Sequence, residues 1–266
     1  MIPGKDREKE MKRSILLAGL GVCLLTGTAL TTGTMAATPA YIEKAVSDPD
    51  RPSTDTSRDA GREPAELTEF AGIKPGMKVV DLLPGAGYFT RIFARAVGPT
   101  GYVYAYFGLQ YDARLKSQGK DPDNQFADLK ATYPNLGVIH GKLEDFVTPE
   151  KVDLVWTADN YHDMLTKAYG PNDTAAVNKA IFNSLKPGGL YVIVDHRSVK
   201  GAGVEISDKL HRADEDVVKS QVEAAGFKLV AESKILTRPT DDDNKRVFEE
   251  GEHDHTDQMV LKFRKP

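Results

Sequence analysis

The stretch that most constrains the fold is Val79–Thr90, with the sequence VVDLLPGAGYFT. A short apolar run ends at Asp81 and is followed by Pro84, Gly85 and Gly87, after which the pattern is helical. A strand, a glycine turn and a helix start predict the first βα unit of an open α/β sheet. Because glycine has no Cβ, such a turn lets the backbone approach a ligand closely, although a plain turn without a ligand is the alternative.

This turn differs from the dinucleotide-binding pattern G-x-G-x-x-G. After Gly85 and Gly87, the third glycine position is occupied by Thr90. The acidic residue that would bind a ribose at the end of the second strand is also missing, because Phe107 stands at that place. The sequence therefore disfavours a nicotinamide dinucleotide as the cofactor.

Apolar segments and helical patterns alternate over most of the chain. Strands are expected at 78–82, 102–106, 137–140, 152–157, 190–195, 228–233 and 258–263, helices at 64–71, 88–97, 124–132, 172–185 and 214–225, and a charged loop at 112–123. This alternation predicts an α/β domain over residues 63–266, with a doubly wound, Rossmann-like and mostly parallel sheet of seven strands. Because no helix is expected between the last two strands, they should form an antiparallel hairpin at one edge.

The N-terminal 36 residues have the parts of a secretory signal peptide. Lys12 and Arg13 precede the apolar run Ile15–Leu25, and small residues lead to Ala36 and Ala37. We expect cleavage after one of these two alanines, which would make the mature protein periplasmic or secreted. The alternative is an uncleaved anchor, although the apolar run is short for a membrane span.

The composition of the expected mature chain excludes several kinds of chemistry. Cys23 is the only cysteine among the 266 residues, so the mature chain would have no disulfide and no thiolate nucleophile. From residue 37 onward, 30 basic and 36 acidic residues give a net charge of about −6, and no basic stripe indicates a nucleic-acid partner. We expect a small-molecule substrate and no stable membrane span after cleavage, and the sequence carries no signal for an oligomer.

Residues 37–62 are polar and contain several proline, aspartate and serine residues. This composition predicts an extended N-terminal arm, in which Tyr41–Val46 could form a helical turn, with a disordered leader as the alternative. Arg58, Asp59 and Arg62 lie close to the next helix in sequence, so the arm could instead fold back over a site.

Polar side chains follow two strands whose carboxyl ends should meet the glycine turn. His162 and Asp163 come after the fourth strand, and His196 ends the fifth. The two histidines are candidate general bases because imidazole titrates near neutral pH, and Asp163 is the third candidate catalytic residue. Alternatively, these side chains only cap a helix or bond to the backbone.

Metal binding is a further alternative for the histidines. His162, His196 and His211 are widely separated in the sequence, so we expect no metal site from them. His253 and His255 lie in an acidic loop that reads as a solvated turn, with weak metal binding as the alternative.

Three motifs together resemble the class I S-adenosylmethionine-dependent methyltransferases. They are the turn at 81–87 (DLLPGAG), the segment 153–156 (DLVW) at the fourth strand, and 185–189 (LKPGG) before the fifth. The resemblance extends from about Pro64 to Phe263 and implies the fold of that family and S-adenosylmethionine as the cofactor. Within the family, 85–90 (GAGYFT) and 160–163 (NYHD) look like a group of exported bacterial methyltransferase-like proteins.

The resemblance also implies which residues contact the amino-acid part of the cofactor. The backbone of Pro84, Gly85 and Gly87 would approach it, and Asp81 would accept a hydrogen bond from its ammonium group. The first glycine of the usual turn is replaced by Leu83.

For the nucleoside part of the cofactor, the sequence departs from the family pattern. Phe107 holds the place of the acid that binds the ribose hydroxyls, and Lys142 holds the commonest acidic place near the adenine. Glu144 or Asp145 could substitute there. Asp159, at the end of the fourth strand, completes the expected set of cofactor-binding residues.

The expected function is methyl transfer from S-adenosylmethionine to an unknown small molecule outside the cytoplasm. The alternative is a periplasmic small-molecule-binding protein on the same scaffold without methyl transfer, favoured by the signal peptide, Phe107 and Lys142. Binding of the cofactor distinguishes the two.

Overall fold

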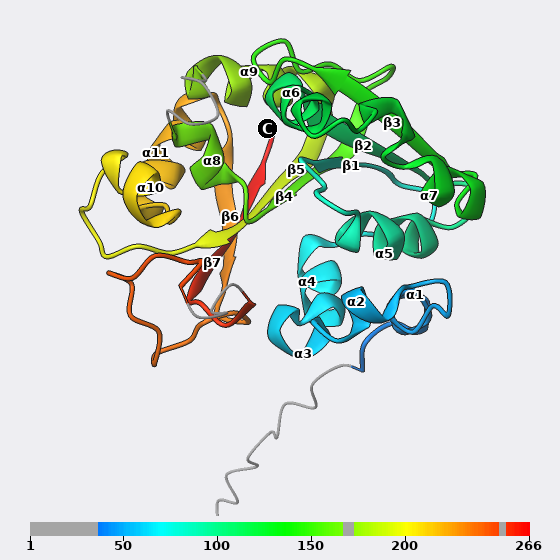
Figure 1. Cartoon of the computed structure of the whole chain (residues 1–266), viewed down its shortest axis with the longest axis horizontal. Helices are drawn as coiled ribbons and strands as arrows, with labels where there is room; N and C mark the ends of the chain where they lie inside the picture. Colours follow the sequence, from blue (N-terminus) through cyan, green and yellow to red (C-terminus); the bar gives the residue numbers. More distant parts are fainter. Residues whose placement is uncertain (1–36, 167–172, 250–253) are drawn as a thin grey trace, which may run out of the picture. The chain divides into compact units, whose positions relative to one another are not determined.

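A seven-stranded sheet with the order β3-β2-β1-β4-β5-β7-β6 forms the centre of the structure (Figure 1). The computed structural model describes residues 37–166, 173–249 and 254–266. The strands are β1 (Lys78–Leu82), β2 (Tyr102–Gly108), β3 (Leu136–Gly141), β4 (Val152–Ala158), β5 (Leu185–His196), β6 (Lys228–Ser233) and β7 (Gln258–Arg264). The pairings among β1 to β5 are parallel, whereas β7 runs antiparallel to both β5 and β6. The predicted mostly parallel sheet with an antiparallel edge hairpin is confirmed.

Helices cover both faces of this sheet. They are α1 (Ala40–Val46), α2 (Ser53–Thr56), α3 (Asp59–Arg62), α4 (Pro64–Ala71), α5 (Tyr88–Val97), α6 (Leu109–Ser117), the 3₁₀ turn η1 (Pro122–Asn124), α7 (Ala127–Thr132), α8 (Tyr161–Leu165), α9 (Thr174–Ser184), α10 (Glu205–Leu210) and α11 (Glu215–Ala224). Among the described residues, none of these helices has the length and apolar character needed to cross a membrane.

Alternate residues of each strand face two separate cores, as the twofold repeat of a strand requires. On one face, Val79 and Trp156 pack with residues of α1, α4 and α5. On the other face, Val80 and Val155 pack with residues of α8, α9 and α11. Because helices cover both faces, the ligand-accessible edge is the one at the carboxyl ends of the parallel strands.

The charged loop expected at 112–123 is helical in its first half. Leu115 is buried in α6, and the ring of Tyr111 stacks on that of Phe107 at 5.2 Å between centroids. Tyr111 and Leu115 are one helical turn apart, a spacing that the surrounding charged residues concealed.

The expectation of an extended arm is wrong for residues 47–62, whereas the helical turn left open at Tyr41–Val46 is found as part of α1. The segment 37–62 forms α1, α2 and α3, and α1 packs against α4 and α5. Ion pairs secure it to the domain, because buried Asp48 accepts two hydrogen bonds from Arg95 on α5, at 2.7 and 2.9 Å. Part of the polar composition of the segment thus serves these pairings with the domain. The expected signal peptide lies outside the described residues.

Docking of α1 can be tested through Ile42, which is fully buried. Ile42→Ala should lower the free energy of unfolding by about 2–5 kcal/mol, because it removes buried methyl groups and leaves a cavity. Lys44→Ala, at an exposed position of the same helix, should change it by less than about 0.5 kcal/mol. Urea unfolding of the full chain, followed by circular dichroism, measures both. An Ile42→Ala protein as stable as the Lys44→Ala control would contradict the docking of α1.

Candidate cofactor and substrate site

Two adjacent cavities lie at the carboxyl edge of the sheet and share a wall made by Leu83, Gly85 and Asn160. The first, of about 160 Å³, is termed the apolar cavity and is lined also by Phe107, Gly108, Gln110, Tyr111, Arg114, Leu143, Asp163 and Met164. The second, of about 210 Å³, is termed the charged cavity and is lined also by Asp55, Arg58, Arg62, Asp81, Pro84, Ala86, Tyr88, Phe89, Ala158 and Asp159. An elongated ligand with one apolar and one charged end fits such a pair.

The two glycines of the turn have different roles. Gly85 has a φ of 57° and borders both cavities, and a Cβ added there meets nothing within 4 Å. Gly87 caps α5 with a φ of 86°, and a Cβ there would lie 2.9 Å from Phe126 and 2.8 Å from Leu129. Gly85 therefore allows close approach of a ligand. Gly87 is required by helix packing and does not line either cavity.

Leu83 keeps the backbone conformation that a glycine would have at this position. Its φ is 59°, in the left-handed region, and its N–H donates to the carbonyl of Tyr106 at 2.8 Å. A left-handed residue with a side chain costs about 1–3 kcal/mol and is concentrated at functional sites. The turn thus has its usual shape despite the substitution, with the leucine side chain in the wall shared by the two cavities.

Asp81 places a buried carboxyl in the wall of the charged cavity. It is 3% exposed, and it accepts a hydrogen bond from the Thr90 hydroxyl at 2.6 Å. Burial raises the pKa of Asp81 to about 7, although the Thr90 bonds and the positive charge of Arg62 act in the opposite direction. A buried carboxyl of this kind is stabilised in its charged form when a cation binds beside it.

Two arginines from the N-terminal helices complete the charged cavity. Arg62 donates to Asp159 at 2.9 Å and lies over the ring of Tyr88, 4.6 Å from its centroid. Arg58 makes two hydrogen bonds to Asp254, at 2.6 and 2.7 Å. Residues 37–62 thus fold back over this cavity, as the sequence had left open.

Asp159 and Asn160 turn the chain at the end of β4. Asp159 has a left-handed φ of 58° and also accepts from the amide of Gln258 at 3.2 Å. Asn160 donates to the carbonyl of Leu83 at 3.0 Å, so it ties the end of β4 to the glycine turn. Asp159 and Pro84 both line the charged cavity, and their roles in cofactor binding stay predictions.

His162 is buried beneath the cavities and does not line them. Its Nδ1 lies 2.7 Å from Asp195 and its Nε2 lies 3.3 Å from Asp163. Burial lowers the pKa of His162, but the Asp195 and Asp163 carboxylates outweigh this effect and raise it to about 10. The raised pKa and the position outside both cavities favour a structural role for His162, and its role as a general base stays a prediction.

His196 is fully buried as well and lines neither cavity. Its Nδ1 lies 2.6 Å from the Thr256 hydroxyl, and its Nε2 lies 3.7 Å from Asp159. It holds the loop after β4 against the start of β7. The geometry favours a structural role for His196 over the expected role as a base.

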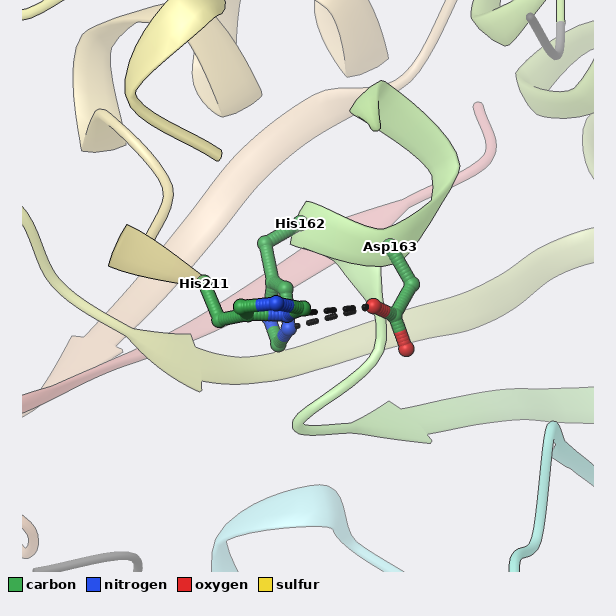
Figure 2. Close-up of side chains that lie close together, drawn as sticks. All are labelled: His162, Asp163 and His211. Carbon is green, nitrogen blue, oxygen red and sulfur yellow. Dashed lines mark ion pairs between the residues drawn. The ribbon is translucent and has the colours of Figure 1, made fainter. Parts of the chain in front are cut away.

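Asp163 is the predicted catalytic residue that lies in a cavity wall, that of the apolar cavity. Figure 2 shows the rings of His162 and His211 directed at the same oxygen of this carboxylate. Burial and the charge of His162 lower the pKa of His211.

Of the nucleoside-binding residues expected from the sequence, one lies at a cavity and two do not. Phe107 lines the apolar cavity, whereas Glu144 and Asp145 do not. Glu144 instead accepts from the backbone N–H of Asp173, and Asp145 is exposed. Gln110, which was not predicted from the sequence, brings an amide to the wall of the apolar cavity from the first turn of α6. Its position three residues after Phe107, just past the end of the second expected strand, could have indicated a polar group at this edge of the sheet.

No protein-family model matches the chain. Among curated proteins, it is 26% identical over 198 residues to the ubiquinone/menaquinone biosynthesis C-methyltransferase UbiE of Pseudomonas aeruginosa, which covers 73% of this chain and 65% of that protein. It is 28% identical over 198 residues to the UbiE of Shewanella halifaxensis, covering 73% and 66%. The matches thus span slightly less than two thirds of the relatives' own lengths.

Two solved structures share the fold. A SAM-dependent methyltransferase from Aquifex aeolicus superposes with a TM-score of 0.52 at 18% identity, covering 85% of this chain and 97% of that one. The 1,6-didemethyltoxoflavin-N1-methyltransferase of Burkholderia thailandensis, solved with 1,6-didemethyltoxoflavin and S-adenosylhomocysteine, gives 0.51 at 18% identity, covering 79% and 80%. The chain thus has the fold of the class I S-adenosylmethionine-dependent methyltransferases and is similar in sequence to C-methyltransferases.

Proposed function

We propose that the protein is an S-adenosylmethionine-dependent methyltransferase that acts on a small molecule outside the cytoplasm. The observation that carries the proposal is the glycine turn. Gly85 borders both the apolar and the charged cavity and has open space where a Cβ would lie. Asp81 is buried in the wall of the charged cavity. S-adenosylmethionine has an apolar adenine at one end and an amino acid at the other, which corresponds to this pair of cavities.

The charged cavity suits the amino-acid end of the cofactor. Asp81 can accept hydrogen bonds from the ammonium group, which favours the charged form of its carboxyl. Arg58 and Arg62 line the same cavity and can attract the carboxylate. The opposite charges that the cofactor carries at this end are thus both matched by side chains of the cavity.

The apolar cavity suits the nucleoside end. Phe107, Leu143 and Met164 provide apolar walls for a purine. Since no acid ends β2, the amide of Gln110 is the group that we assign to the ribose hydroxyls. A neutral amide makes weaker hydrogen bonds than a carboxylate, so we expect modest affinity for the cofactor.

When bound, the cofactor would supply an electrophilic methyl group on its sulfonium. The chain's part is to hold the acceptor in line with that methyl group and to exclude water. Asp163 is the side chain of the apolar cavity wall that can orient an acceptor or take its proton. The buried ion pair between His162 and Asp195 keeps the start of α8, and with it Asp163, in place.

The location outside the cytoplasm rests on the sequence. The expected signal peptide and the resemblance to an exported group support it. The relatives named above are, by their names, methyltransferases of quinone biosynthesis. We do not extend their substrates to this protein and propose only a small-molecule acceptor.

A second candidate function, favoured by the replacement of the ribose-binding acid by Phe107, is a small-molecule-binding protein on the same scaffold. The apolar cavity would then hold a ligand other than S-adenosylmethionine. Binding of the cofactor separates the two functions.

Calorimetric titration with S-adenosylhomocysteine tests the proposal. The full chain should bind it, and Gly85→Val should weaken binding by more than about tenfold, the equivalent of 1.4 kcal/mol, because the valine side chain occupies the space between the cavities. Gly98→Val is a matched control, since Gly98 also has a positive φ and open space around a Cβ but lines neither cavity. Absence of heat with the unaltered chain at millimolar ligand would overturn the methyltransferase proposal.

Affinity for S-adenosylhomocysteine should depend on pH through Asp81. Because the pKa of Asp81 is raised to about 7, its carboxyl is mostly protonated at pH 5 and cannot pair with the ligand's ammonium group. Affinity should fall by about fiftyfold between pH 7 and pH 5, as linkage to one ionisation requires. Titrations at several pH values measure this, and Asp81→Asn should bind weakly with little pH dependence. A flat profile in the unaltered chain would contradict the role of Asp81.

A further inference from the structure

Two histidines and a carboxylate meet beside the apolar cavity. His162 Nε2 lies 3.3 Å, and His211 Nδ1 lies 3.8 Å, from the same oxygen of Asp163. The ligand atoms that these three residues offer all lie within 4.8 Å of one another (Figure 2). The residues are distant in sequence, which argued against a metal site, but the fold brings α8 and the end of α10 together.

The orientation of His162 is fixed in the manner of a metal ligand. Its Nδ1 lies 2.7 Å from one oxygen of Asp195, and its backbone N–H donates to the other oxygen at 2.6 Å. Asp195 is fully buried, so this arrangement is rigid. Metal-binding histidines commonly give their second N–H to a carboxylate, which leaves the other nitrogen free to coordinate. Here that other nitrogen is Nε2, which faces Asp163.

The separations are close to those of a coordinated ion. Zinc lies about 2.0–2.2 Å from nitrogen and oxygen ligands, so neighbouring ligand atoms of a tetrahedral site are about 3.3–3.5 Å apart. The distance between His162 and Asp163 already has this value. His211 is only partly buried, so a small rotation of its ring can close the remaining gap.

The backbone and the packing of His211 direct its ring toward Asp163. His211 ends α10 in a left-handed conformation with a φ of 54°, and its ring packs on Phe248 at 5.0 Å between centroids. Its buried Nδ1 has no hydrogen-bond partner among the described residues. Arg246 lies 3.1 Å from its Nε2 and is exposed. Arg246 must release Nε2 when Nδ1 coordinates a metal, and as a surface side chain it can do so readily.

The charges of the cluster also favour a divalent cation. Asp195 and Asp163 lie on opposite nitrogens of one imidazole, so two negative charges face a single ring. A divalent ion at Nε2 takes the place of a proton there and balances both carboxylates. Two histidines and one carboxylate with open positions are a ligand set for divalent first-row transition metals.

We propose that His162, Asp163 and His211 bind a divalent transition-metal ion of the zinc class, with Asp195 as the positioning residue. Asp163 lines the apolar cavity, so the open coordination positions adjoin that cavity. Resting on the proposed function, we further infer that the ion binds an oxygen atom of the methyl acceptor. The acceptor class is then a small molecule with a hydroxyl or carboxylate group.

Metal titration of the full chain tests this inference. Protein purified without a polyhistidine tag and treated with a chelator should bind one Zn²⁺ by calorimetry, and one Co²⁺ with visible absorption bands of a coordinated ion. His211→Ala should lose these bands, and Asp195→Asn should weaken Zn²⁺ binding by about 10–100-fold. Arg246→Ala should tighten it, because the competing guanidinium is removed. Circular dichroism confirms that each variant is folded.

The matched control is the double variant His253→Ala/His255→Ala, which removes two histidines of the acidic loop and should bind Co²⁺ unchanged. If this variant loses the ion while His211→Ala keeps it, the loop is the ligand and the inference is overturned. Absence of cobalt bands in the unaltered chain at millimolar Co²⁺ also overturns it. These measurements contain no cofactor, so metal binding without binding of S-adenosylhomocysteine would overturn the proposed function and leave the metal site intact.

Discussion

The position of β1 between β2 and β4 is the constraint on which the site depends. From β1 the chain proceeds outward through β2 to β3, then crosses back to place β4 on the other side. The segments that leave β1 and β4 therefore diverge at their carboxyl ends and leave a crevice, as in other open α/β sheets. Asp81, the glycine turn and Asp159 all follow directly from these two strands, and both cavities open at this place.

Electrostatic pairing shapes the walls of the charged cavity in this crevice. Arg62 pairs with Asp159, Arg58 pairs with Asp254, and each pair is partly or mostly shielded from solvent. Shielded pairs of this kind keep their strength better than exposed ones when salt is added. These ion pairs fix the positions of Arg58, Arg62 and Asp159. Asp81 is not part of them and can pair with a cation that enters the cavity. The charged cavity is thus organised before any ligand arrives.

Local signals in the sequence predicted the strands, the glycine turn and the place of Asp81, because strand periodicity and glycine position act over a few residues. Features set by distant pairing escaped prediction. The helices of residues 37–62 are stabilised by contacts with α4, α5 and a C-terminal loop, so their polar sequence alone suggested an extended arm. The raised pKa of His162 depends on the carboxylates of Asp195 and Asp163, and the contact with Asp195 is made only in the fold. Gln110 was missed because the sequence predicted no helix at 109–117 and a charged loop from residue 112.

The ion pair between Arg58 and Asp254 joins residues 196 positions apart. Closing so long a loop costs conformational entropy, which only the completed set of contacts offsets. The wall of the charged cavity at Arg58 therefore depends on a contact between segments from opposite parts of the sequence. A chain shortened before Asp254 would lose this partner of Arg58 and also β7, the strand that joins β5 to β6 in the sheet. The charged cavity and the edge of the sheet thus depend on the same C-terminal segment.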